Sequence, residues 1–277
     1  MPDIRYAQNE NVDRGDLRMQ VIERGTSTPI DDAKISISYS GDPDSTVEEV
    51  NTDASGMSET LTLDTPPLEL SMQPSEVQPY AEYTIQVTAK GYRPINISGI
   101  EVFSGQLSLQ EIRMDAEETT ESMTDNIVIP AHTLFAEYPP KIAEAEIKPV
   151  TETGEIVLSR VVIPEYVIVH DGAPSDPTAR DYYVRYRDYI KNVASSEIYS
   201  TWPDATIRAN VLAIMSFTLN RVYTEWYRNK GYSFTITSST AYDQKFMYGR
   251  NIYQSISDVV DEMFQNYLSR PNVRQPI

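Results

Sequence analysis

The sequence contains no cysteine and only two histidines among its 277 residues. The absence of cysteine excludes disulfide bonds, thiolate metal sites and a cysteine nucleophile. It does not identify the compartment, because exported chains can also lack cysteine. A Ser-His-Asp triad would need a partner for His132 or His170, and the spacing of the sequence supplies none.

Long apolar runs are also missing. No stretch approaches the roughly 20 consecutive apolar residues of a membrane-spanning helix, so we expect no membrane span. The first residues, MPDIRYAQNENVDRGD, are polar and lack the apolar core of a signal peptide. Either a signal is missing from this sequence or the protein reaches its site by another route. Hydrophobic residues still make up 40% of the chain, which is enough for globular cores.

Positive charge is scarce in the first part of the chain. Residues 1–160 carry 11 Lys+Arg against 29 Asp+Glu, whereas residues 161–277 carry 12 of each. The net charge of −18 therefore belongs to the first part. Nucleic acid is not an expected partner, because binding to phosphates needs a basic surface. The acidic part is typical of a soluble, self-repelling surface.

Short alternating segments follow a predicted flexible tail at residues 1–15. Between residues 16 and 115, turn-forming Gly, Pro, Asp and Asn separate stretches that suit strands with one buried face. The predicted strands are residues 16–25, 33–41, 58–65, 81–94 and 106–114. Strands at this spacing predict a small antiparallel β-sandwich over residues 16–115.

Two segments within this region match a known type of sandwich. Residues 51–63, NTDASGMSETLTL, and residues 83–102, YTIQVTAKGYRPINISGIEV, resemble the carboxypeptidase-regulatory or transthyretin-like domains. The resemblance implies an accessory or folding module. No pair of acids or nucleophile arrangement in this region points to a catalytic site.

Residues 116–154 predict a connector. The stretch AEETTESMTDN is acidic, rich in Ser and Thr and without periodicity, and four prolines follow at positions 130, 139, 140 and 149. Such a sequence favours extended chain lying on a surface. Exposed connectors of this composition are the places where proteases cut.

Residues 155–277 predict a second domain that starts with an apolar, β-rich segment and continues with three helices. The helices are expected at about residues 183–198, from after Pro203 to Gly231, and at residues 252–268. The second helix has one apolar stripe, formed by Ile207, Val211, Met215, Leu219, Val222 and Trp226. The expected fold class is therefore α+β and multidomain, with an N-terminal antiparallel β-sandwich and a C-terminal mixed helical and β domain.

The stretch DYIKNVASSEIYSTWPDATIRANVLAIMSFTLN carries a second resemblance. Its Ser196-Glu197-Ile198, its Trp202-Pro203 and the AYDQ and YG segments between residues 241 and 249 resemble the domain of the stage II sporulation protein D family, which cleaves peptidoglycan. The combination with an upstream sandwich is similar to the germination-specific spore cortex-lytic enzymes of spore-forming bacteria. In those enzymes the acidic sandwich would form part of a pro-region.

The resemblance implies a lytic transglycosylase that acts on spore cortex peptidoglycan outside the cytoplasm, in the spore or cell wall. It implies Glu197 as the catalytic acid, with Tyr242, Gln244 and Tyr248 positioning sugar. Trp202 is either a core residue or a surface on which sugar stacks. The implied partners are peptidoglycan glycan strands and an activating protease that cuts the connector of a latent pro-form.

The sequence departs from the family at two points. Relatives usually continue into an S-Q-W-G motif, whereas this chain stops at RPNVRQPI, so the second domain is expected to be truncated. Some members bind zinc through Cys and His, but no cysteine is present here. We therefore expect neither a metal nor another cofactor.

A single acid suits this chemistry. It protonates the glycosidic oxygen and then, as a carboxylate, accepts the proton of the sugar's own 6-hydroxyl, whereas ordinary glycosidases need two carboxylates. Glu197 must then lie in apolar surroundings that raise its pKa, and Ile198, Tyr199, Trp202 and the apolar stripe of the next helix are the expected walls. The opposing hypothesis is a solvated glutamate at the end of a helix.

Two other functions stay open. The chain could be a non-catalytic cell-wall or spore-coat module that keeps the fold, or a binding protein recruited through its sandwich. Asp258, Asp261 and Glu262 are expected to form a solvated helix face rather than a metal site.

Overall fold

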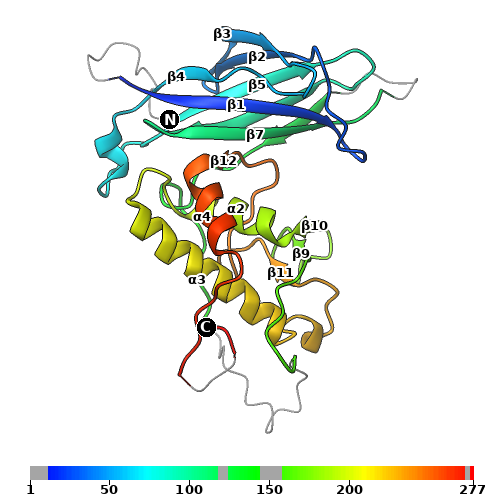
Figure 1. Ribbon diagram of the computed structural model, residues 1–277, viewed down its shortest axis with the longest axis vertical. Coiled ribbons are helices and arrows are strands. Elements are labelled where there is room, and N and C mark those ends of the chain that lie inside the picture. The colour runs from blue at the N-terminus through cyan, green and yellow to red at the C-terminus, as the bar shows by residue number, and fades with distance from the viewer. Residues whose placement is uncertain (1–11, 118–123, 144–157, 272–274) are drawn as a thin grey trace. The chain divides into compact units, whose positions relative to one another are not determined.

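The computed structural model describes residues 12–117, 124–143, 158–271 and 275–277 (Figure 1). The fold is α+β, with mixed sheets and three α-helices among the described residues. These residues form two compact units. The first comprises the chain up to Ala131 together with residues 199–202 and 248–255, and the second comprises residues 132–198, 203–247 and 256–277.

The first unit contains two β-sheets, and Figure 1 shows their strands running alongside one another. The four-stranded sheet has the order β12-β7-β1-β4, with β12 Ile252–Tyr253, β7 Leu107–Met114, β1 Asp13–Glu23 and β4 Leu61–Thr65. The five-stranded sheet has the order β3-β2-β5-β6-β8, with β3 Asp42–Asn51, β2 Lys34–Tyr39, β5 Ala81–Thr88, β6 Ile95–Val102 and β8 Asp125–Val128. A short 3₁₀-helix, η1, spans Leu68–Ser71.

The strands bury alternate residues, as the sequence pattern predicts. In β1, Leu17, Met19 and Val21 are fully buried, and Ile35 and Ile37 are fully buried in β2. Successive side chains of a strand point to opposite faces, so these apolar sets form the core of a β-sandwich. All five predicted strands overlap an observed one. The prediction missed β3, β6 and β8, and β3 offers no alternation because almost all of it is exposed.

The pairing differs from the predicted antiparallel sandwich. β1 pairs in parallel with β7, and β6 pairs in parallel with β8, so both sheets are mixed. β8 also lies inside the predicted connector, and β1 starts at Asp13 inside the predicted tail. The other parts of these predictions, residues 1–11, 118–123 and 144–157, lie outside the described residues.

Residues Asp53–Gly56 form a tight turn between β3 and β4. The Asp53 carboxylate accepts hydrogen bonds from the main-chain N–H groups of Ser55 (2.8 Å) and Met57 (3.0 Å). Gly56 has a left-handed φ of 73°, and a Cβ there would lie 2.4 Å from the carbonyl oxygen of Val21. The turn therefore requires glycine at this position.

Later parts of the chain complete the first unit. β12 adds an edge strand to β7, and just before it the guanidinium of Arg250 pairs with the carboxylate of Glu101 on β6. Neither side chain of this ion pair is exposed. The side chain of Asn251 bonds the main chain of Glu101 through its amide nitrogen (2.8 Å) and its oxygen (3.2 Å). The predicted helix at residues 252–268 was wrong at both ends, because its first two residues pair with a strand and the helix α4 spans only Gln254–Met263.

The segment at residues 199–202 also packs within the first unit. The ring of Phe103 lies 5.2 Å from that of Tyr199 and 5.4 Å from that of Tyr253, measured between centroids. The indole N–H of Trp202 donates to the carbonyl of Ser71 at 3.0 Å. Aromatic residues from three parts of the sequence therefore share one core. The predicted domain boundaries remain predictions.

The second unit combines a small sheet with helices. Its sheet has the order β10-β9-β11, with β10 Asp181–Arg185, β9 Tyr166–His170 and β11 Ile236–Thr237. The helices are α2 Tyr186–Glu197, α3 Asp204–Tyr223 and α4, with a 3₁₀-helix η2 at Arg228–Lys230. Figure 1 shows α3 as the longest helix of this unit.

The stripe predicted on α3 is buried except for Val222, which is half-buried. The predicted end at Gly231 was wrong. The helix ends at Tyr223, because Glu225 adopts a left-handed φ of 48° and the N–H of Trp226 folds back to the carbonyl of Arg221 (3.1 Å). Gly231, with φ of 87°, caps η2 instead.

The buried ion pair predicts a large loss of stability when one partner is removed. We expect Arg250→Met to lower the free energy of unfolding by about 3–5 kcal/mol, because it leaves Glu101 as a buried, uncompensated charge. The comparison is urea unfolding followed by circular dichroism.

Two variants calibrate this measurement. Arg14 pairs with Asp64 at an exposed site, so Arg14→Met is expected to cost less than about 1 kcal/mol. The double variant Glu101→Gln/Arg250→Met is expected to recover part of the loss. Equal effects of Arg14→Met and Arg250→Met would contradict the structural role of the buried pair.

Candidate functional site

Glu197 is the last residue of α2. The next residue, Ile198, is extended, and its N–H bonds the carbonyl of Ala194 at 3.1 Å, which closes the helix. The Glu197 side chain is only partly exposed, and its Oε1 accepts the main-chain N–H of Lys245 at 2.7 Å. A loop 48 residues further along the chain therefore holds the carboxyl group.

The surroundings of Glu197 raise its pKa to about 7, and burial is the main cause. The hydrogen bond from the N–H of Lys245 and the positive charge of Lys141 act in the opposite direction without cancelling it. A carboxyl with this pKa holds its proton for part of the time near neutrality. It can both donate and accept a proton there.

The loop that bonds Glu197 is fixed by Asp243. This buried carboxylate pairs with Arg221 of α3 (Nε to Oδ1, 2.7 Å) and accepts the hydroxyl of Tyr227. It also accepts the N–H (2.9 Å) and the hydroxyl (2.7 Å) of Thr237 at the end of β11. With these partners Asp243 acts as an anchor for the loop.

Both sides of Lys245 have further ties to helices. The Gln244 side chain accepts the hydroxyl of Thr218 (2.8 Å) and that of Tyr189 (3.3 Å), and its amide donates to the carbonyl of Ile214 (3.0 Å). Met247 exchanges two main-chain hydrogen bonds, at 2.8 and 2.9 Å, with the side chain of Asn192 on α2. The position of the N–H that reaches Glu197 is therefore determined by packing.

The predicted site residues divide between the two units. Glu197, Tyr242 and Gln244 belong to the second unit, where Tyr242 is half-buried. Trp202 and Tyr248 belong to the first, where the hydroxyl of Tyr248 accepts a hydrogen bond from Arg24 at 2.6 Å.

Three residues near Glu197 were not predicted. Lys245 contributes a main-chain N–H, Tyr189 lies on the same helix and interacts with Glu197 electrostatically, and Lys141 supplies a positive charge. A main-chain donor leaves no mark in the residue type. Tyr189 lies eight residues before Glu197, about 12 Å along the axis of α2, so the spacing alone did not indicate their interaction.

His170 has hydrogen-bond partners on both ring nitrogens. One ring nitrogen bonds the carboxylate of Asp181 at 2.7 Å, and the other bonds the carbonyl of Asp176 at 3.0 Å. The imidazole stacks on Phe234 with centroids 4.4 Å apart. Both nitrogens are thus occupied within the second unit.

The acidic residues of α4 lie on an exposed face, as predicted. Asp261 pairs with Lys191 (2.7 Å), and Glu262 pairs with Arg208 (2.8 Å). Within the described ranges, no group of three or more His, Cys, Asp or Glu side chains is arranged to hold a metal ion. In the same ranges, no helix has the length and apolar character needed to cross a membrane.

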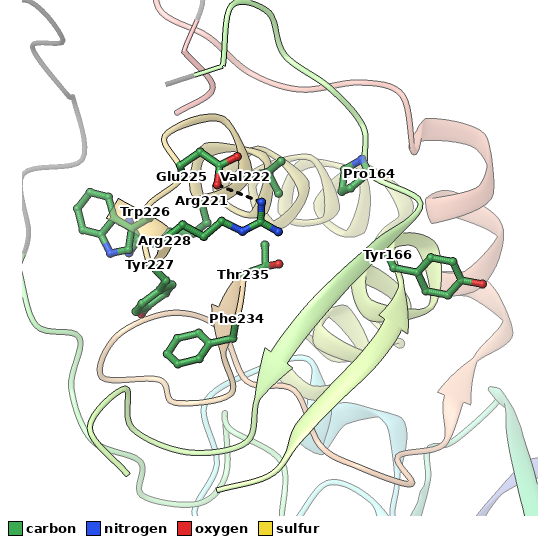
Figure 2. Close-up of a pocket in the computed structure, with 10 residues that line it drawn as sticks. All are labelled: Pro164, Tyr166, Arg221, Val222, Glu225, Trp226, Tyr227, Arg228, Phe234 and Thr235. Atoms are coloured by element: carbon green, nitrogen blue, oxygen red, sulfur yellow. Dashed lines mark ion pairs between the residues drawn. The ribbon is translucent and has the colours of Figure 1, made fainter. Parts of the chain in front are cut away.

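A cavity of about 190 Å³ lies elsewhere in the second unit (Figure 2). Figure 2 shows Thr235 near its centre, with Pro164 and Tyr166 on the side of β9 and the ion-paired Glu225 and Arg228 above. Its described lining includes none of the predicted site residues. This cavity is therefore not the site around Glu197.

Comparisons with known proteins add no family. No family model matches the chain, and no curated protein matches it either. Similar solved structures include the TIE protein of Bacillus anthracis, at 15% identity, covering 38% of this chain and 17% of that chain, with a TM-score of 0.26. They also include 5-hydroxyisourate hydrolase of Klebsiella pneumoniae, at 17% identity, covering 37% and 92%, with a TM-score of 0.25.

A third similar structure is catechol 1,2-dioxygenase of Pseudomonas arvilla C-1, at 14% identity, covering 42% of this chain and 56% of that chain, with a TM-score of 0.26. TM-scores at this level carry no conclusion about the function of this chain.

The raised pKa of Glu197 predicts a pH-dependent stability. Near pH 4.5, its ordinary pKa, the unfolded chain begins to release this proton, whereas the folded chain holds it until about pH 7. Ionisation therefore favours unfolding, and stability falls as the pH rises through this window, by about 3 kcal/mol for this group.

We expect Glu197→Gln to remove this component from the difference in unfolding free energy between pH 4.5 and 7.5. Glu165→Gln, at an exposed position of the same unit, is the matched control and should leave the pH dependence unchanged. An identical pH dependence in wild type and Glu197→Gln would refute the raised pKa.

Proposed function

We propose that the chain cleaves peptidoglycan glycan strands as a lytic transglycosylase, with Glu197 as acid and then base. One observation carries the proposal: the carboxyl of Glu197 lies in a site whose burial raises its pKa to about 7, and a fixed main-chain N–H holds it there. A group that protonates a leaving oxygen and then accepts a proton at the same pH needs a pKa near that pH. The proposed place of action is the spore or cell wall.

Glu197 alone can carry out both proton transfers that the reaction requires. Protonated Glu197 gives its proton to the glycosidic oxygen as the bond from that oxygen to the anomeric carbon breaks. The resulting carboxylate accepts the proton of the 6-hydroxyl of the same sugar, whose oxygen bonds the anomeric carbon. The products are an anhydro sugar and a free hydroxyl on the other fragment, no water is consumed, and Glu197 is again protonated.

The environment of the neighbouring acid supports a single-carboxylate mechanism. Hydrolases that retain or invert configuration generally need a second carboxylate that acts as nucleophile or base. Asp243, two residues from Lys245, pairs with Arg221 and accepts hydrogen bonds from Tyr227 and Thr237. These contacts leave Asp243 as an anchor of the loop rather than as a second reactive acid.

The test is digestion of spore cortex peptidoglycan, with anhydro products measured by mass spectrometry. We expect wild type to release them and Glu197→Gln to release at least about 100-fold less, because general acid–base catalysis typically contributes 10²–10⁴. Glu165→Gln controls for removal of a carboxylate at an exposed site. Anhydro products from Glu197→Gln at the wild-type rate would eliminate Glu197 as the acid.

We also propose that the protein is a latent form activated by a protease that cuts the connector, residues 116–154. The first unit contains residues 199–202 and 248–255, so a cut chain keeps non-covalent ties between its parts. We expect limited proteolysis of the connector to raise lytic activity while both fragments still elute together from a sizing column. Equal activity before and after the cut would end the latency proposal.

The alternative is a non-catalytic cell-wall or spore-coat module. One observation favours it: Trp202 and Gln244, two of the residues proposed to contact sugar, use their side chains in internal hydrogen bonds. Binding to sacculi without any cleavage products, in both the intact and the cut protein, would support this alternative.

A further inference from the structure

The segment at residues 132–142, here called the strap, follows the sandwich in sequence but belongs to the second unit. At its start, Thr133 donates its N–H (3.2 Å) and its hydroxyl (2.8 Å) to the carbonyl of Ser196. This carbonyl directly precedes Glu197 in the last turn of α2, where carbonyl groups have no partner within the helix. The strap therefore satisfies the end of the helix that carries the proposed acid.

At its other end the strap bonds three successive residues of the loop that holds Glu197. The carbonyl of Pro139 accepts the hydroxyl of Thr240 (2.9 Å), and the N–H of Ile142 donates to the carbonyl of Ala241 (2.6 Å). The ammonium of Lys141 donates to the carbonyl of Tyr242 (3.0 Å). These bonds precede the anchor Asp243, so the strap joins the helix end to the start of the loop.

The strap also brings charge and aromatic surface to this place. The ammonium of Lys141 lies 3.8 Å from the ring centroid of Phe217, and that of Lys245 lies 5.3 Å from the ring of Tyr138 on the strap. Such contacts favour one position of each cation.

Two interactions lower the pKa of Glu197: the hydrogen bond from the main-chain N–H of Lys245 in the loop and the positive charge of Lys141 on the strap. The charge of Glu197 in turn raises the pKa of Tyr189 on α2. The buried ion pair between Asp243 and Arg221 fixes the same loop to α3.

We propose that the strap is a positioning element of the site around Glu197, with Lys141 as its positioning residue, and not part of a removable connector. The inference rests on the proposed function and adds an account of how the site around Glu197 is regulated. An activating cut in the connector must then fall outside residues 132–142. A cut within the strap would separate the tie to Ser196 from the ties to the loop.

The first experiment measures the proton affinity of Glu197 directly. Carboxyl ¹³C signals of glutamate are followed by NMR over pH, and Glu197→Gln identifies the signal. Without the positive charge of Lys141, the pKa of Glu197 is expected to rise in Lys141→Met by up to about one unit, limited by solvent screening because Lys141 is exposed. The alkaline limb of the pH–rate profile should shift in the same direction.

Matched variants make the result specific. Lys141→Arg should restore the wild-type titration, and Lys90→Met, at an exposed lysine of the first unit, should leave it unchanged. An unchanged Glu197 signal in Lys141→Met overturns the role of Lys141. If wild type releases no anhydro sugar, the proposed function fails, while the titration still tests the strap.

The second experiment places one cleavage sequence of a specific protease either between Ala116 and Thr124 or between Glu137 and Tyr138. The uncut form of each variant serves as its own reference. Cutting at the first place should leave the Glu197 titration unchanged, whereas cutting at the second should shift it and abolish lytic activity. The same response to both cuts would show that the strap is only a connector.

Discussion

The ion pair between Glu101 and Arg250 holds a late segment of the chain in the sandwich. Both side chains are fully buried, and a buried ion pair is retained only where its geometry is good, because desolvation of two charges is costly. The pair fixes residues 248–255 into the sandwich, next to the two-residue strand β12. The sandwich thus includes chain that lies about 150 residues later in the sequence.

The loop that holds Glu197 is fixed by contacts within the second unit. The side chain of Asn192 bonds Met247, Asp243 pairs with Arg221, and the strap bonds the carbonyl of Ser196 just before the acid. A loop held by these contacts can keep a donor at a fixed distance from an acid.

Local patterns were predicted well, and long-range contacts were not. The alternation of apolar and polar residues predicted five of the strands, and the spacing of apolar residues predicted the buried face of α3. Both patterns depend only on the geometry of a single strand or helix. β12 was assigned to a helix, since two residues have no period of their own. The expected apolar walls of Glu197 remain a prediction, and the ring of Tyr199 also packs on Phe103. The family resemblance singled out Glu197, but its actual partners are a main-chain N–H and a distant lysine, which residue types do not reveal.

The features that suit Glu197 to proton transfer also oppose folding. Burial raises its pKa to about 7, and the same burial makes its ionised form costly. Near neutrality the carboxylate is therefore more stable in the unfolded chain, where water solvates it, than in the folded protein. A main-chain donor limits this cost without adding a second titratable group to the reaction. Lys141 then adjusts the balance from an exposed position, where solvent weakens its effect. A stronger or more deeply buried cation would return Glu197 to an ordinary carboxylate and remove the proton that the proposed reaction has to donate.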